Sequence, residues 1–121
     1  MVEKQRLDKP YNLEERTLKF SKEVIILCKK LPKDIVNLKL IGQLVDAATS
    51  VGANYREANE ALSKKDFSHR MKITRKECKE CSYWLELVKQ ANTNLDGEID
   101  SFIAETRELR NIFTAIIDKS A

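Results

Sequence analysis

Two stripes of polar residues are the first candidates for chemistry in this chain of 121 residues. Members of each stripe recur at a spacing of three and four, which places them on one face of a helix. The first stripe consists of Gln43, Ala47, Ser50, Asn54, Glu57 and Ala61. The second consists of Arg70, Ile73, Glu77, Glu80, Trp84 and Leu87. Carboxylates at the edge of an apolar core lose hydration and need partners, and the candidates for this role are Arg16, Gln43, Asn54 and Arg70.

Three roles are open to these stripes: a structural polar network that fixes helix register and subunit geometry, a contact with a ligand or subunit, or a di-metal carboxylate site. The structural role is favoured. Di-metal bundles normally combine glutamates with Glu-x-x-His pairs. Glu77 and Glu80 have no histidine at that spacing, and the only histidine, His69, falls on another face. We therefore expect neither a metal nor a cofactor.

The Cys78-x-x-Cys81 pair has the spacing of a metal or redox motif. Both residues fall on the apolar face of a predicted helix, where a free thiol packs as a small hydrophobe. A zinc site would need two further ligands, and neither Cys28 nor His69 is placed to complete it. The odd number of cysteines favours reduced thiols. No catalytic pairing of Ser, Cys and His and no glycine-rich phosphate loop is present, so the sequence predicts a non-enzymatic protein.

A row of basic side chains is the strongest candidate for binding a partner. Its members recur at a spacing of 4-3-4-3-4, with Lys64 and Arg75 beside them: Lys65, His69, Lys72, Lys76, Lys79 and Tyr83. On a helix this row is a ridge about 27 Å long. Such a ridge is either a solvated helix face or a salt-sensitive contact with nucleic-acid phosphates. The residues predicted to make that contact are Lys65, Lys72, Arg75, Lys76 and Lys79.

Charge is unevenly distributed, although the net charge is only +3. Residues 64–79 carry seven Lys/Arg and two acids, and residues 1–33 carry nine and five, which leaves surpluses of +5 and +4. Residues 94–121 carry three and six, a deficit of −3. This asymmetry permits an anionic partner on one face of the molecule.

Capping signals define the helices that must position these side chains. Asn12 begins the first helix, with Glu15 completing a capping box, and Pro32 ends it. Ser63 and Asp66 form the same box at the start of the third helix.

The other boundaries carry weaker signals. The second helix is expected to begin between residues 34 and 37 and to run to about Leu62. The third ends near residues 92–94, where Asn94 or Asp96 caps the fourth.

Each expected helix has an apolar or small seam of heptad type. The first seam is Leu13, Thr17, Phe20, Val24, Leu27 and Leu31. The second is Leu38, Ile41, Val45, Ala48, Gly52, Tyr55, Asn59 and Leu62. The third is Phe67, Met71, Thr74, Cys78, Cys81, Leu85 and Val88. The fourth is Ile99, Phe102, Thr106, Leu109, Phe113 and Ile116.

Four such seams joined by short connections predict an all-α, antiparallel up-down-up-down four-helix bundle over residues 12–121. Residues 1–11 are expected to be a flexible N-terminal tail. Gly42 and Gly52 indicate places where another helix passes close to the backbone. With no long apolar run and no signal peptide, no contact with a membrane is expected and the cytoplasm is the expected location.

Two of the helices carry more apolar side chains than one seam needs. The additional residues are Leu18, Ile25, Ile26, Cys28, Ile103, Ile112 and Ile117. They form either a generous core or a subunit interface, because a small monomer seldom leaves a large apolar patch in water.

Three segments resemble a known family: ERTLKFSKEV, QLVDAATSVGANYREANEALSKKDF and KECKECSYWLEL. They are similar to the four-helix bundle proteins encoded in intervening sequences of bacterial 23S ribosomal RNA genes. The specific part is Gln43-x₆-Ser50-x₃-Asn54-x₂-Glu57 followed by Glu77-x₂-Glu80-x₃-Trp84. The chain also resembles the related accessory variability proteins of diversity-generating retroelements, which are basic bundles that associate with nucleic acid and a reverse transcriptase.

The resemblance implies a cytoplasmic bacterial protein that forms a ring-like homo-oligomer, with a pentamer as the leading candidate and no established reaction. Two functions follow as hypotheses. The first is a non-enzymatic oligomer that associates with RNA or DNA through the basic ridge. The second is an assembly or adaptor module that acts only through protein–protein contacts, whose oligomer a charge at Ile25 or Ile103 should dissociate.

Overall fold

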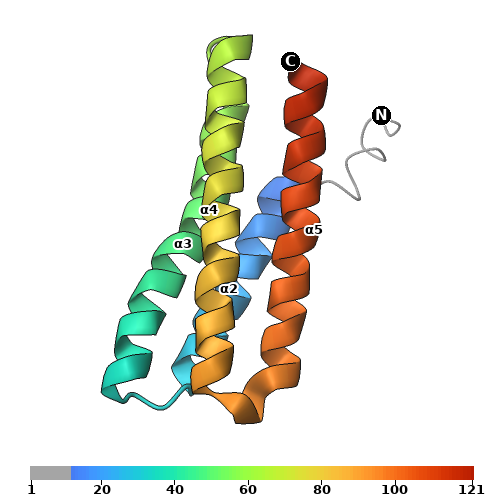
Figure 1. Ribbon diagram of the computed structural model, residues 1–121. Coiled ribbons are helices and arrows are strands. Elements are labelled where there is room, and N and C mark those ends of the chain that lie inside the picture. Colours follow the sequence, from blue (N-terminus) through green and yellow to red (C-terminus); the bar gives the residue numbers. More distant parts are fainter. Residues whose placement is uncertain (1–11) are drawn as a thin grey trace.

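The computed structural model describes residues 12–121, which contain four α-helices and no strand (Figure 1). The tail predicted for residues 1–11 lies outside the described residues. The elements, in chain order, are α2 (Leu13–Lys30), α3 (Ile35–Asn59), α4 (Lys64–Ala91), the 3₁₀ turn η1 (Thr93–Leu95) and α5 (Asp96–Ser120).

The helices pack in sequence, α2 on α3, α3 on α4 and α4 on α5, which confirms the predicted antiparallel bundle (Figure 1). α2 is the shortest, with 18 residues against 28 in α4. At 1.5 Å per residue it covers about 27 Å of a bundle about 42 Å long. Figure 1 shows the consequence, since α2 begins well below the tips of the other three helices.

The predicted caps of the first and third helices are confirmed. The side chain of Asn12 accepts a hydrogen bond from the backbone N of Glu15 at 3.5 Å. Ser63 Oγ accepts one from the backbone N of Asp66 at 3.0 Å. Each bond satisfies an amide that has no partner within its own helix. Asp34 caps α3 in the same way, at the early edge of the expected range.

The cap predicted for the fourth helix, at Asn94 or Asp96, is wrong. The 3₁₀ turn Thr93–Leu95 leads into α5, and Leu95 occupies the N-cap position without a side-chain hydrogen bond. The backbone N of Leu95 donates instead to the carbonyl of Asn92 at 2.9 Å. A backbone turn thus performs the role that the sequence assigned to a polar side chain.

Two seams lie where they were predicted. All six residues of the first seam, from Leu13 to the C-cap residue Leu31, are buried. In α4, every seam residue from Met71 to Val88 is buried, and Phe67 is half-buried. Three of the additional apolar residues of α2, namely Leu18, Ile25 and Ile26, remain exposed.

The seam of α3 lies one residue earlier than predicted. Its buried residues are Asn37, Leu44, Ala47, Ala48, Val51, Gly52 and Ala58. Leu38 is 55% exposed, and Leu62 is 96% exposed because α3 ends at Asn59. α3 is packed by α2 on one side and α4 on the other, so its small residues, which permit close approach on both sides, form the centre of the buried strip.

The seam of α5 also differs from the prediction at two positions. Ile103 and Ile117, expected as additional apolar surface, belong to the core, whereas Phe102 and Ile116 are half-buried. Of the two interior glycines, only Gly52 marks a close approach. A Cβ there would lie 3.0 Å from Thr17 Oγ1, while nothing lies within 4 Å of one at Gly42.

A buried pair of amides joins the first turn of α3 to the end of α4. Asn37 and Asn92 each donate to the other's side-chain oxygen at 2.9 Å, and both residues are buried. Their remaining amide hydrogens go to the backbone carbonyls of Pro32 and Val88. All four donors are therefore used, as burial of an amide requires.

Candidate nucleic-acid interface

Basic side chains from α4 and α5 line an open hollow of about 570 Å³ between the two helices. We call it the basic groove, and its residues are Lys72, Arg75, Lys76, Lys79, Arg110 and Thr114. The α4 residues are held there because Met71, Thr74 and Cys78 bury the opposite face of the same turns. The amphipathic spacing of α4 therefore determines the position of the cations.

The cations of the basic groove have no acidic partner within the described part of the chain, since no carboxylate oxygen lies within 4.0 Å of them. Arg75 Nη1 donates to Thr114 Oγ1 at 3.3 Å, which directs its guanidinium across to α5. Lys72, Lys76 and Lys79 are exposed. The positive charge of the groove is thus available to an external anion.

Arg110 is half-buried and borders the core beneath the groove. The thiol of Cys78 lies there, and it donates to the backbone carbonyl of Thr106 at 3.3 Å. Burial raises the pKa of Cys78 to about 12, and the positive charge of Arg110 opposes that increase. Burial likewise raises the pKa of Cys28 to about 11. All three cysteines, Cys81 included, are free, buried and protonated at neutral pH. The seam predicted this burial for Cys78 and Cys81, whereas Cys28 was expected as additional apolar surface.

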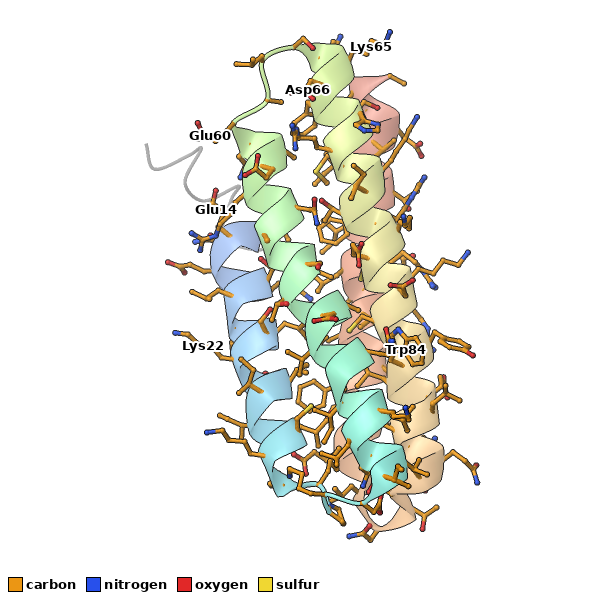
Figure 2. All side chains as sticks on the ribbon, turned by 90° about the vertical axis from the view of Figure 1, so that its left-hand side faces the viewer. Glu14, Lys22, Glu60, Lys65, Asp66 and Trp84 are labelled. Atoms are coloured by element: carbon orange, nitrogen blue, oxygen red, sulfur yellow. The ribbon has the colours of Figure 1, made fainter. Side chains whose placement is uncertain are left out.

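Four of the five residues predicted to bind phosphates come together in the basic groove. The fifth, Lys65, is exposed at the tip of α4, away from the groove (Figure 2). Sequence reasoning missed Arg110 and the exposed Arg107 one turn before it. The spacing Arg107-x₂-Arg110-x₃-Thr114 was a usable signal, but the acidic total of residues 94–121 concealed it.

Three acids of α5, Glu98, Glu105 and Glu108, pair with α2, whereas Asp100 pairs with Lys89 of α4 at 2.8 Å. Glu105 binds Arg16 through two hydrogen bonds of 2.7 and 2.9 Å, and Glu108 binds the same guanidinium. The hydrogen bond with Glu105 is the main cause that raises the pKa of Arg16. Lys30 and Glu98 form a further pair at 2.6 Å. Arg16 therefore pairs with α5 and not with the polar stripes.

Comparison with known proteins places the chain in a family. The profile described as 23S rRNA-intervening sequence protein matches residues 11–115. The chain belongs to this family. Its fold also matches a crystal structure of a protein of unknown function from the S23 ribosomal protein family of Bacteroides thetaiotaomicron, with a TM-score of 0.77 and 30% identity over 86% of this chain and 96% of that chain. Curated proteins gave no match.

The family match covers most of α5, whereas the three segments that carry the resemblance in the sequence end at Leu87, within α4. Both helices of the basic groove are therefore part of the 23S rRNA-intervening sequence protein fold. Within residues 12–121 no helix could cross a membrane, and no cluster of three or more His, Cys, Asp or Glu side chains could hold a metal ion.

The polar stripes of this family member are only partly exposed on α3 and α4, and Ala47 of the first stripe is buried in the core. They make one ion pair between the helices, Arg70 Nη1 to Glu57 at 3.6 Å. Asn54 donates instead to the carbonyl of Ser50 in its own helix. Gln43, Glu57 and Glu80 are exposed, so the expected loss of hydration does not apply to these residues.

The second stripe contains two half-buried side chains, Glu77 and Trp84. Burial, and next the charge of Glu80, raises the pKa of Glu77. Trp84 Nε1 is buried and has no hydrogen-bond partner among residues 12–121. The role of the stripes in fixing subunit geometry stays a prediction.

Proposed function

We propose that this 23S rRNA-intervening sequence protein is a non-enzymatic cytoplasmic protein that binds the phosphate backbone of RNA or DNA through the basic groove. One observation supports the proposal above all. Five cationic side chains from two helices surround one hollow, and no carboxylate within residues 12–121 pairs with them. Lysines and arginines that neutralise phosphates release the cations condensed on the nucleic acid, and this release drives binding.

The form of the groove favours a polyanion over a small anion. Its cations extend along α4 from Lys72 to Lys79, about 10 Å at 1.5 Å per residue, and Arg110 adds a second row. Exposed lysines hold one small phosphate weakly, because water screens each contact. A polymer engages several of them at once, and each contact adds to the affinity.

The family context supports the same function. A resemblance to retroelement accessory proteins, which are basic bundles that associate with nucleic acid, makes RNA and its DNA copy the first ligands to test. The family name describes where the genes lie and does not by itself assign a ligand. If the chain forms the ring that the resemblance implies, with a pentamer as the leading arrangement, the groove repeats around it and avidity strengthens binding.

Charge reversal in the groove tests the proposal. Replacing Lys72, Lys76 and Lys79 together by Glu is expected to weaken binding of a labelled oligonucleotide at least a hundred-fold at low salt, as measured by fluorescence anisotropy. Each lost phosphate contact should also reduce, by about 0.7–0.9, the magnitude of the slope of the logarithm of the binding constant against the logarithm of the salt concentration. Thermal unfolding should change little, because all three side chains are exposed.

A matched control carries the same change in net charge. Lys22, Lys29 and Lys39 are exposed residues of α2 and α3, and none of them forms an ion pair with another residue in the range 12–121. Their replacement by Glu should leave most of the affinity intact. Equal losses in the two triple variants, or no binding by the wild type at low salt, would refute the groove as the site.

A second candidate function, an assembly or adaptor module that acts only through protein–protein contacts with its own copies or with a partner protein, rests on a different surface. α2 exposes Leu18, Ile25 and Ile26, and the first turn of α3 exposes Ile35 and Val36. Large apolar side chains in water favour association. Ile25→Glu should dissociate a defined oligomer in light scattering, since Ile25 is 40% exposed. Ile103, the other position expected from sequence, is buried and unsuitable for this test.

A further inference from the structure

An exposed aromatic ring continues the row of lysines beyond the basic groove. Tyr83 lies one turn after Lys79 on α4, and with Lys72 and Lys76 these residues keep the 4-3-4 spacing of one helix face. The Tyr83 side chain is 58% exposed. Its hydroxyl has no hydrogen-bond partner in the described part of the chain. The core therefore does not account for this ring.

The Tyr83 ring rests against a fixed neighbour. Its centroid lies 5.0 Å from that of Trp84, with an angle of 76° between the ring planes. Trp84 is half-buried and packs against the core cluster that contains Cys81 and Leu85. Figure 2 shows Trp84 on the lower half of α4, far from the tip that carries Lys65. This edge-to-face contact restricts the ring of Tyr83. Binding of a ligand to the ring therefore costs little side-chain conformational entropy.

Two carboxylates flank the ring. Glu80 and Glu86 stand three residues before and after Tyr83, and both are exposed and form no ion pair with any residue that the structure describes. They repel a phosphate at this end of the ridge. A nucleic acid that runs along the lysines must therefore present an uncharged part, its base, to Tyr83.

We infer that the basic groove takes a single strand of nucleic acid, with its phosphates on Lys72, Lys76, Lys79 and Arg110 and one base stacked on Tyr83. The inference rests on the proposed function and adds the class of ligand. A duplex keeps its bases stacked inside, whereas a single strand can turn a base outward onto an aromatic ring. Every base has a flat face, so this contact tolerates any sequence.

The test compares Tyr83→Ala with Tyr83→Phe, which keeps the ring. Anisotropy is measured with a single-stranded oligonucleotide, with its duplex and with inorganic polyphosphate as a competitor that has no bases. Tyr83→Ala should weaken single-strand binding roughly ten-fold, as expected for one stacked base. Tyr83→Phe should stay within about two-fold of the wild type, and neither variant should change the affinity for duplex or polyphosphate. Leu62→Ala removes another exposed apolar side chain, far from the groove, and serves as the matched control.

The outcomes separate this inference from the function on which it rests. If Tyr83→Ala binds the single strand as well as the wild type while the triple lysine variant does not, the stacking role is overturned and the groove stands. Equal losses of Tyr83→Ala on strand and polyphosphate, or tighter binding of duplex than of single strand, also overturn it. If the triple lysine variant binds normally, both proposals fall.

Discussion

On the side of α5 that faces α2, Glu98, Glu105 and Glu108 reach across to Lys30 and Arg16. On the side that faces α4, Asp100 pairs with Lys89, but Arg110 borders the basic groove, where no carboxylate among residues 12–121 pairs with the cations. One helix thus carries an internally neutralised surface and an uncompensated one, although its total charge is acidic. The comparison shows that the charge of a segment says little until its neighbours are known.

The two sides also differ in what their charges do for the fold. Arg16 and Glu105 form a two-bond guanidinium–carboxylate pair that is about three-quarters shielded from water, and such geometry stabilises a fold. The basic groove brings like charges together, which costs free energy through mutual repulsion. The stability of the fold therefore does not explain why these positive charges lie close together on one side of α5.

Among single substitutions, the largest expected effect comes from reversing one charge on the uncompensated side. Arg110→Glu replaces attraction by repulsion for a phosphate in the basic groove. The change of charge from +1 to −1 should reduce the binding free energy by about 2 kcal/mol at the protein surface. Oligonucleotide affinity should fall roughly thirty-fold in anisotropy measurements. Arg56→Glu is the control on α3, and a comparable loss there would show that net charge, and not the groove, governs binding.

The neutralised side should respond in the opposite way. Arg16→Ala leaves Glu105 and Glu108 without their partner, so the free energy of unfolding in urea should fall by about 1–2 kcal/mol. Oligonucleotide affinity should stay within two-fold. If Arg16→Ala instead lowers affinity and leaves stability unchanged, the two sides do not divide their roles as described.

Alkaline pH should weaken the core beneath the basic side. The folded-state pKa of Cys78 is raised to about 12, whereas an unfolded thiol ionises near pH 8.5. Stability is therefore complete below about pH 8.5 and is lost as pH rises toward 12, by about 1 kcal/mol per pH unit for this thiol. Urea unfolding at pH 8 and pH 10 measures the slope. Cys78→Ala should reduce it, and an unchanged slope would contradict the assignment.

The smallest effect is expected at the exposed pair of the neutralised side. Lys30 and Glu98 are 2.6 Å apart, but water screens both. Lys30→Ala should change the free energy of unfolding by at most about 0.5 kcal/mol. A loss as large as that of Arg16→Ala would mean that charge count, and not bidentate geometry, stabilises this side.

Features that depend on residues close in sequence could be predicted, whereas features that depend on contacts between distant helices could not. The caps at Asn12 and Ser63 and the seams of α2 and α4 depend on residues within one or two turns, and all were predicted. In α3, the small residues Ala47, Ala48 and Gly52 fit two neighbouring seams equally well, and only packing by α2 and α4 chooses between them.

The sequence predicted the part of the candidate site that lies on α4 but not the part that lies on α5. Lys72, Arg75, Lys76 and Lys79 share a face of one helix and could be grouped by spacing. Arg110 joins them only because α5 folds back along α4, and no local pattern states which side of α5 will face which neighbour. The partner of Arg16, 89 residues away in Glu105, was out of reach for the same reason.

The reciprocal amide pair of Asn37 and Asn92 acts as an alignment pin for the α3–α4 hairpin. The two amides can satisfy each other only when the first turn of α3 is level with the end of α4. This pin lies at the end of the bundle opposite to the turn between Asn59 and Lys64. That turn is therefore relieved of setting the alignment, and it is the place where the chain can be lengthened, or a foreign loop inserted, without sliding one helix past the other.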